Sequence, residues 1–214
     1  VSSHSYEKGS SRPVFPCNAK SWGRRFASEC WRIPAARFEG WEVMQHIGFL
    51  VSTLSSPGGT GRVVANVANR MVDDYEVHVI GAYHSGDGEP AFAYDSRVHR
   101  LNILSKEPRI REANKELKKP LIDYIEQNHI EVLFLIGSYQ GAYTMSTMPA
   151  CKSCKFVFCD HGALMNEWNN KPIRFIRFLA SVLSDMTAVL TQRSEQAYRE
   201  KFHTPARKLR RSEE

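Results

Sequence analysis

The 214-residue sequence lacks a long hydrophobic run and a regular arrangement of cysteines. No stretch approaches the roughly 18 consecutive apolar residues of a membrane-spanning helix, and residues 1–43 lack the unbroken apolar segment of a secretory signal. The five cysteines form an odd number without a disulfide framework, which indicates reduced thiols. These absences argue against a membrane-embedded or disulfide-stabilised secreted protein and lead us to expect a cytoplasmic one.

The body of the chain also lacks an excess of charge of one sign. Residues 44–204 carry 18 Lys and Arg against 17 Asp and Glu. The basic excess comes from the ends, with seven basic against four acidic residues in 1–43 and four against two in 205–214. A nearly neutral body is not typical of a protein that binds a phosphate backbone, so we expect no nucleic-acid partner.

Regular periodicity begins near Met44. Residues 1–43 mix Ser, Arg, Pro and isolated aromatic residues without a strand or helix repeat. We expect this irregular segment to be either a non-native or alternative-start extension or a real accessory arm. Residues 44–204 are predicted to form one folded domain, and residues 205–214 a basic polar tail.

From Met44 onward, short apolar runs alternate with helical patterns. Ile47–Val51 and Val132–Ile136 are the clearest buried strands. Further strands are predicted near 76–80, 98–104, 155–159 and 188–191, and helices near 60–71, 110–128, 173–183 and 194–202. Pro120 should kink the helix predicted over 110–128 or restart it. The alternation predicts an α/β fold: a single Rossmann-like, doubly wound, mostly parallel sheet flanked by helices.

The first loop that favours ligand binding is 55–61, between the first strand and the first helix. Ligands of such sheets bind beyond the carboxyl ends of the strands, and glycines let a phosphate approach the free amides of a helix start. Gly58, Gly59 and Thr60 are therefore candidate phosphate-binding residues, with Thr60 also the expected N-cap. The spacing is not that of a dinucleotide-binding or P-loop motif, and a tight turn is the alternative.

The segment Gly58–Asn69 followed by Tyr75–Ile80 resembles the amino-terminal domain of family 4 glycosyltransferases, and the resemblance extends over residues 44–204. Members of that family are two-lobed GT-B enzymes, so the resemblance implies one lobe of a GT-B fold. It also implies that Gly58 and Gly59 lie against the diphosphate of a nucleotide-sugar donor. Gly61 departs from the family, which often has Glu at this position.

Two further loops follow predicted strands. Ser138, Tyr139 and Gln140 suit a sugar or acceptor surface, although an ordinary capped turn explains them as well, and relatives often have His near this point. The resemblance matches His161 to a histidine beside the transferred sugar, where a neutral imidazole could bond a hydroxyl as a catalytic or positioning group. The alternative is a His that caps a strand end. Asp160 either orients His161 or points to the opposite face.

Two other patterns compete with these interpretations. Cys151, Cys154, Cys159 and His161 supply four potential zinc ligands, but the spacing is not standard and Cys159 lies in an apolar strand, so we predict no metal site. Residues 171–179 combine basic and large apolar side chains, which fits peripheral attachment to an anionic membrane. Burial against the sheet explains the apolar part equally well.

The resemblance implies the acceptor-side domain of a hexosyltransferase-type GT-B enzyme, with a nucleotide-sugar donor, a glycan or lipid-linked acceptor and no cofactor. The donor-binding lobe of such an enzyme does not follow residue 204 here. We therefore expect the isolated chain to be inactive and a second GT-B lobe to act in trans. The alternative is a non-catalytic Rossmann-like binding module, or a truncated gene product that acts with a partner chain. The expected location is the cytoplasm, including the inner face of the membrane.

Overall fold

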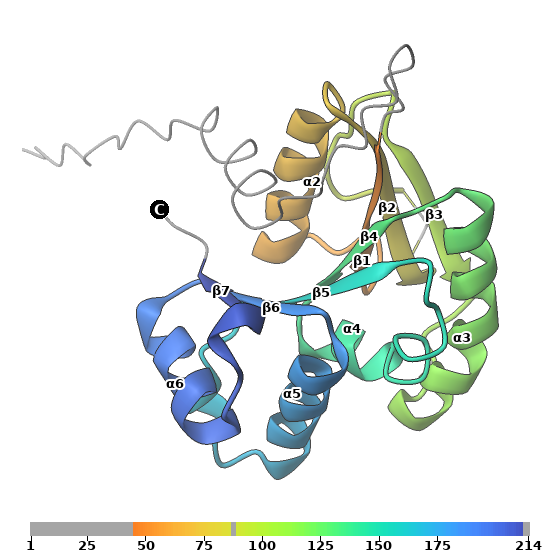
Figure 1. The fold of residues 1–214 in the computed structure, drawn as a ribbon. Coiled ribbons are helices and arrows are strands. Elements are labelled where there is room, and N and C mark those ends of the chain that lie inside the picture. The colour runs from red at the N-terminus through yellow and green to blue at the C-terminus, as the bar shows by residue number, and fades with distance from the viewer. Residues whose placement is uncertain (1–44, 87–88, 212–214) are drawn as a thin grey trace, which may run out of the picture.

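The computed structural model describes residues 45–86 and 89–211, and these form a parallel sheet with helices on both faces (Figure 1). The strands are β1 (Gln45–Val51), β2 (Tyr75–Tyr83), β3 (His99–Leu104), β4 (Val132–Ile136), β5 (Lys155–Asp160), β6 (Met186–Val189) and β7 (Leu209–Arg211). The helices are α2 (Gly59–Met71), α3 (Ile110–Gln127), α4 (Ser138–Tyr143), α5 (Lys171–Leu183) and α6 (Gln192–Phe202), with short 3₁₀ turns at Leu164–Glu167 and Ala206–Lys208. The predicted extension 1–43 lies outside the described residues.

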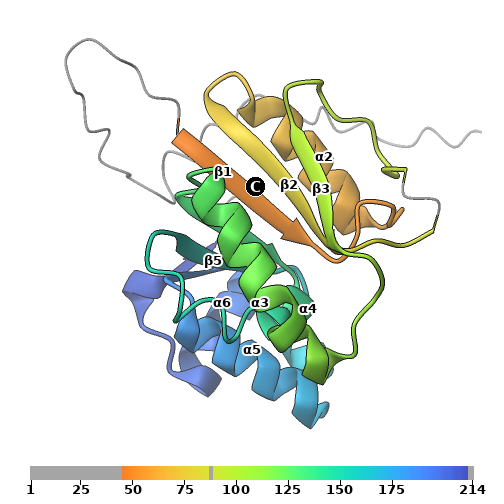
Figure 2. The same cartoon turned by 90° about the vertical axis from the view of Figure 1, so that its right-hand side faces the viewer.

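The strand order is β3-β2-β1-β4-β5-β6-β7, and every neighbouring pair is parallel. The chain runs outward from β1 to β3, then crosses back to β4 and continues in the other direction. Since crossovers between parallel strands are right-handed, this reversal places α2 on one face and α3 to α6 on the other (Figures 1 and 2). The predicted α/β, doubly wound fold is confirmed.

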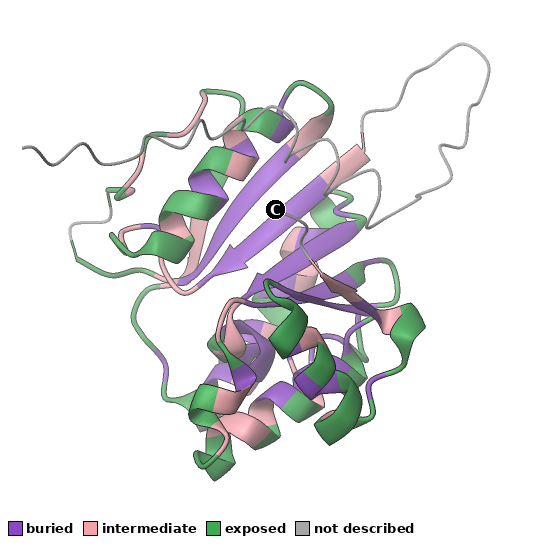
Figure 3. Cartoon of the chain, turned by 90° about the vertical axis from the view of Figure 1, so that its left-hand side faces the viewer, coloured by how far each residue is buried: buried purple, intermediate pink, exposed green. Residues whose placement is uncertain are grey.

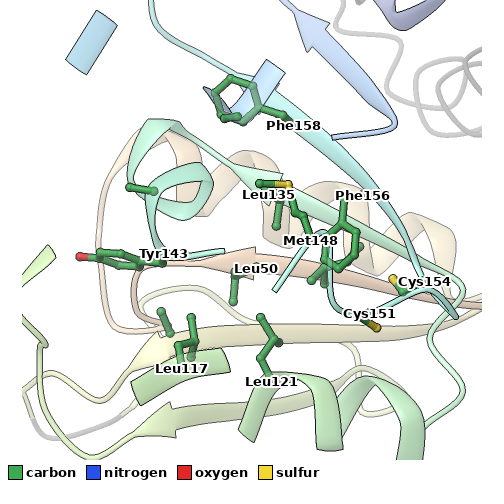
Figure 4. Packing of buried hydrophobic residues seen from close by; sticks show 14 of the residues in the cluster. Leu50, Leu117, Leu121, Leu135, Tyr143, Met148, Cys151, Cys154, Phe156 and Phe158 are labelled. Carbon is green, nitrogen blue, oxygen red and sulfur yellow. The ribbon is translucent and has the colours of Figure 1, made fainter. Parts of the chain in front are cut away.

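The sheet is buried on both faces because its strands are apolar on both sides. Alternation along β1 sends Leu50 toward α3 and Phe49 toward α2, so the two side chains belong to different core clusters. The larger cluster packs Leu117 and Leu121 of α3 against the sheet (Figure 4). Burial follows the strands as a continuous band, while the outer sides of the helices are exposed (Figure 3).

Of the two alternatives for Pro120, a bend or a restart of the helix, the restart is excluded, because one helix, α3, runs from Ile110 to Gln127 with Pro120 inside it. Leu117 and Leu121 flank the proline on the inner side and are both fully buried. Pro120 itself is exposed. The apolar contacts of the two neighbouring leucines therefore hold the helix together across the missing backbone hydrogen bond.

Two expectations about element ends were also wrong, and one short helix was missed. Helix α2 begins at Gly59 with Gly58 as its N-cap, so Thr60 lies inside the first turn and does not cap it. The predicted polar tail contains β7, which pairs with β6 at the edge of the sheet and buries Leu209. The short helix α4 was not expected. A three-residue strand and a six-residue helix are too short to show a periodic pattern.

Candidate functional site

The three loops singled out in the sequence meet in one cleft of about 400 Å³ at the carboxyl edge of the sheet. Its position, beyond the ends of β1, β4 and β5, spans the point where the strand order reverses, which is where doubly wound sheets bind ligands. The predicted site residues that line it are Gly58, Thr60, Ser138, Tyr139, Gln140 and His161. Gly59 lies between two of them at the start of α2 and is not itself part of the lining.

The start of α2 presents unpaired backbone amides to the cleft. The first intrahelical hydrogen bond runs from Arg62 N to Gly58 O (3.2 Å), so the amides of Gly59, Thr60 and Gly61 have no partner within the helix. The first turn contains no acidic side chain that would compete for them. Together with the positive end of the helix dipole, these amides form a suitable site for an anion such as a phosphate.

A side chain at Gly59 would extend into open space, since a Cβ there meets no atom within 4 Å. At Gly61 the corresponding Cβ would lie 2.9 Å from the Ser56 carbonyl oxygen and 3.1 Å from Phe92. Glycine therefore has a different structural role at each of the two positions. Gly61 is required by packing, whereas Gly59 leaves free space on the surface of the helix start.

The loop after β4 turns on Gly137, whose φ of 99° and ψ of 168° are accessible to glycine and strained for other residues. Behind it, Gln140 is buried and ties the ends of β1 and β4 together. With its amide oriented to satisfy both groups, Gln140 donates to the Ile136 carbonyl (2.6 Å) and accepts from the N–H (2.7 Å) and hydroxyl (2.6 Å) of Ser52. Tyr139, which is 46% exposed, is the side chain of this loop that is open to a ligand.

The loop after β5 is anchored by Asp160, which is 1% exposed. Its carboxylate accepts hydrogen bonds from Tyr198 Oη (2.7 Å) and Gly162 N (3.1 Å), and Arg177 Nε lies 3.4 Å away. Burial raises the pKa of Asp160, and the positive charge of Arg177 opposes that shift. The hydrogen bonds of Asp160 thus go to Tyr198 and to the loop backbone at Gly162, and its expected role of orienting the His161 ring is not observed.

Arg177 is a cleft residue that the sequence did not reveal. The sequence assigned it to a basic surface stripe, but its side chain is 3% exposed and lines the cleft. Nη2 donates to Glu167, while Nη1 has no hydrogen-bond partner among the residues that the structure describes. A buried guanidinium with a free donor is suited to an anionic or hydroxyl-rich ligand, because it is otherwise unsatisfied.

His161 lies where the cleft meets a second, smaller and apolar pocket of about 50 Å³. That pocket is bounded by Val63 of α2, by Phe134 and Ile136 of β4, and by Leu190. Burial lowers the pKa of His161, and the charge of Asp160 opposes this shift. The imidazole is therefore neutral near pH 7 and can both donate and accept a hydrogen bond.

The competing zinc arrangement does not form. Cys151 and Cys154 pack in the core cluster on the α3 side of the sheet, whereas Cys159 belongs to the cluster on the α2 side. His161 lies beyond the end of the strand, at the cleft. Cys159 and His161 both line the small apolar pocket on the α2 side, whereas Cys151 and Cys154 lie on the opposite side of the sheet, so the four suggested ligands are not brought together.

Helix α5 presents large apolar side chains to solvent on its outer side. Phe175 is 60% and Val182 is 51% exposed, and Phe178 and Leu183 also project outward. Arg177, from the same helix, faces the cleft. Among the described residues, no helix combines the length and the apolar character needed to cross a bilayer.

The parallel sheet, its strand order and the cleft at its carboxyl edge define the class of the protein as a Rossmann-like, doubly wound α/β domain. A model of glycosyltransferase family 4 matches residues 57–211, which is more than half of the sequence, and the chain belongs to that family. It is therefore a glycosyltransferase-like domain, as the resemblance of residues 44–204 predicted.

Two relatives illustrate this relationship. The chain is 26% identical over 166 residues to an "Uncharacterized glycosyltransferase" of Haemophilus influenzae, a match that covers 75% of this chain and 45% of that protein. The chain thus spans about half the length of this curated relative. A crystal structure of sucrose-phosphate synthase from Thermosynechococcus elongatus shares the fold, with a TM-score of 0.55 and 11% identity, over 78% of this chain and 88% of that one.

Proposed function

We propose that this chain is the acceptor-side lobe of a two-lobed enzyme that transfers a sugar, of the hexosyltransferase type, from a nucleotide-sugar donor to a glycan or lipid-linked acceptor. The observation that supports this most directly is the convergence of three separate loops in one cleft. Each loop offers a different chemistry to that cleft: free amides at α2, an exposed aromatic ring at Tyr139 and a neutral imidazole at His161.

In this proposal the start of α2 binds the donor diphosphate. Its amides of Gly59, Thr60 and Gly61 have no intrahelical partner, and the open space at Gly59 allows a phosphate to approach the backbone. The free Nη1 of Arg177 supplies a second, buried donor for an oxygen of the donor or the acceptor. A bound anion would satisfy both sets of groups, which gives the cleft a preference for negatively charged ligands.

His161 and Tyr139 then act on the sugars. The neutral imidazole of His161 hydrogen-bonds a hydroxyl of the transferred sugar, and the exposed ring of Tyr139 offers a surface on which a sugar stacks. Gln140, whose amide is already engaged by Ser52 and Ile136, positions the loop and does not bind the acceptor directly. This changes the role expected for Gln140 and keeps Ser138 and Tyr139 as acceptor-binding residues.

Transfer requires a second lobe, because a GT-B cleft is closed by two lobes and the described residues form one. The test therefore supplies a carboxy-terminal lobe of a family 4 relative in trans and measures nucleotide release with a panel of nucleotide sugars. We expect transfer only when both lobes are present. Defined donor binding without any transfer would favour the alternative, a non-catalytic binding module.

Variants at Gly59 assign the activity to this cleft. Gly59→Val should lower transfer on the order of a hundredfold, because its branched side chain occupies the space of the phosphate, and Gly59→Ala should have a smaller effect. A further test variant is His161→Ala, which removes the imidazole from the cleft. Its control is His84→Ala, which removes an exposed histidine outside the cleft lining. Equal activity in all four variants would show that the chemistry takes place elsewhere.

We further propose that the domain works at the cytoplasmic face of a membrane, with α5 touching the lipid surface. Cys151 and Cys154 are buried and form no disulfide, as is usual in a reducing compartment. Phe175 and Phe178, which are exposed, lie on the same helix as Lys171. Helix α5 therefore combines apolar and basic groups. A lipid-linked acceptor would reach the cleft from such a surface.

Sedimentation with vesicles tests this attachment. The chain should bind vesicles that contain anionic lipids and lose most of this binding in the double variant Phe175→Ser, Phe178→Ser. The matched control is Ile110→Ser, which removes an exposed apolar side chain from α3. Binding that is equal in both variants, or absent in the parent chain, would contradict a role for α5.

A further inference from the structure

A cluster of histidines lies away from the cleft, near the amino-terminal ends of the strands. The rings of His46, His78 and His99 are stacked in series, with centroids 6.0 Å and 4.7 Å apart. His129 meets His46 edge-on at 6.4 Å. None of these residues belongs to the proposed sugar-transfer site, which lies at the opposite edge of the sheet.

The register of the parallel strands brings three ligating side chains together. Glu76 and His78 are two residues apart on β2 and therefore share a face, and β3 pairs in a register that sets His99 directly beside His78. The carboxylate of Glu76 and Nε2 of His99 are in contact. One ligand atom from each of the three residues lies within 4.8 Å of the other two.

His78 is the fixed member of this group. It is 2% exposed, and its Nδ1 is hydrogen-bonded to Tyr124 Oη of α3 at 2.9 Å. Its Nε2 is buried and has no hydrogen-bond partner among the described residues. When Nδ1–H donates to Tyr124, Nε2 keeps its lone pair, which is the tautomer that binds a metal ion.

We propose that Glu76, His78 and His99 bind a divalent transition-metal ion of the zinc type, with Tyr124 as the outer-shell partner of His78. Two imidazoles and a carboxylate are a ligand set that zinc accepts, with water completing its coordination. This inference does not depend on the proposed sugar transfer.

The movement that the site requires is small. Ligand atoms around a tetrahedral zinc are roughly 3.3 Å apart, so the separations among the three ligand atoms must change by on the order of an ångström. Glu76 and His99, which are in contact, must move slightly apart to admit the ion. His99 and Glu76, whose side chains are 51% and 36% exposed, are free to make this adjustment around the buried His78. The ion would join edge strand β3 to β2 and, through Tyr124, to α3.

Metal titration of the full 214-residue chain tests the proposal. After treatment with a chelator, the chain is titrated with Zn²⁺ against a chromophoric competitor, and its melting temperature is followed in parallel. We expect one ion per chain and a rise in melting temperature, because a ligand that binds only the folded state stabilises it. His99→Ala and Glu76→Gln should weaken binding on the order of a hundredfold, and Tyr124→Phe roughly tenfold.

His84→Ala, which removes an exposed histidine outside the cluster, should retain the full affinity. The absorption spectrum of the Co²⁺-loaded chain separates this site from a cysteine site, because only thiolate ligands give an intense charge-transfer band. Retention of binding in His99→Ala, a thiolate band, or the absence of saturable Zn²⁺ binding would each overturn the proposal.

Discussion

At the scale of single residues, the carboxylate of Asp160 holds the loop that carries His161. It is buried and accepts a hydrogen bond from Tyr198, itself fully buried on α6. Tyr198→Phe removes that donor and leaves the ring in place. We expect the free energy of unfolding to fall by about 1.5–3 kcal/mol, the usual contribution of a hydrogen bond to a charged group, as measured by urea denaturation.

The matched control for this prediction is Tyr139→Phe, which deletes the hydroxyl of an exposed tyrosine in the same cleft. Its free energy of unfolding should stay within about 0.5 kcal/mol of the parent value, as for most surface substitutions. Equal stability of the two variants would mean that Asp160 does not depend on Tyr198.

The lowered pKa of His161 predicts how stability changes with pH. Burial holds the folded-state pKa below the unfolded value of about 6.5, so the unfolded chain takes up a proton first as the pH falls. The contribution of the buried, neutral His161 to the free energy of unfolding is therefore complete above about pH 6.5. It decreases as the pH falls below that value. His161→Gln should flatten this part of the curve of unfolding free energy against pH.

Urea titrations at a series of pH values measure this effect. His84→Gln, an exposed histidine outside the cleft, is the matched control and should keep the slope of the parent chain. If His161→Gln also keeps the parent slope, burial of the imidazole does not set its protonation.

Residues of the site differed in how well the sequence revealed them. Gly58, Thr60 and His161 follow or precede strongly apolar strands, so their place in the cleft follows from the local pattern. Arg177 and Tyr198 gave no such signal. Their roles depend on contacts with Asp160, which is 38 residues from Tyr198 in the sequence, and only the packing of α5 and α6 on the sheet creates those contacts.

At the scale of elements, α3 contains a proline that costs stability. Pro120 cannot donate the backbone hydrogen bond that would reach Glu116, and its side chain is exposed, so replacing it loses no core contact. A proline inside a helix is less favourable than alanine by roughly 3 kcal/mol. Pro120→Ala should therefore raise the free energy of unfolding by about 1–3 kcal/mol in urea denaturation.

Lys119→Ala is the neighbouring control. It removes an exposed ion pair with Asp123 and should change stability by about 0.5 kcal/mol or less. A loss of stability in Pro120→Ala would show that the proline fits a bend that the packing of Leu117 and Leu121 requires.

The elements that the sequence predicted well are those with a long apolar pattern. β4 was predicted with its observed bounds, and β1 and β2 were found but extend further than expected. β6 begins two residues earlier than expected, and β7 and α4 were missed. A short strand at the edge of a sheet forms because it pairs with the neighbouring strand, as β7 pairs with β6. Such pairing involves residues far apart in the sequence, so the local sequence pattern does not predict it.

At the scale of the whole molecule, the position of the cleft follows from topology. The seven strands of the described residues are all parallel, so their carboxyl ends lie at one edge, and the reversal between β1 and β4 places the cleft there between α2 and α4. The sequence was sufficient to predict this edge. It did not predict the histidine cluster at the other edge, because the juxtaposition of His78 and His99 depends on the register between β2 and β3.

A single lobe of this type should bind a nucleotide sugar weakly and not transfer its sugar. The resemblance to two-lobed GT-B enzymes implies that a second lobe supplies part of the contacts to the donor. Without about three charge-assisted hydrogen bonds, each worth roughly 1.5–3 kcal/mol, the free energy of donor binding is less favourable by on the order of 5–9 kcal/mol. At about 1.4 kcal/mol per tenfold, this corresponds to an affinity weaker by roughly a thousandfold or more.

Calorimetry of the 214-residue chain with several nucleotide sugars should therefore give dissociation constants on the order of millimolar or weaker. Nucleotide release should stay at background, because a half-open cleft neither excludes water nor aligns donor and acceptor. The matched experiment adds the second lobe and should restore both affinity and turnover. Micromolar binding by the single chain, or turnover that Gly59→Val abolishes in a folded variant, would show that the cleft described here is sufficient by itself.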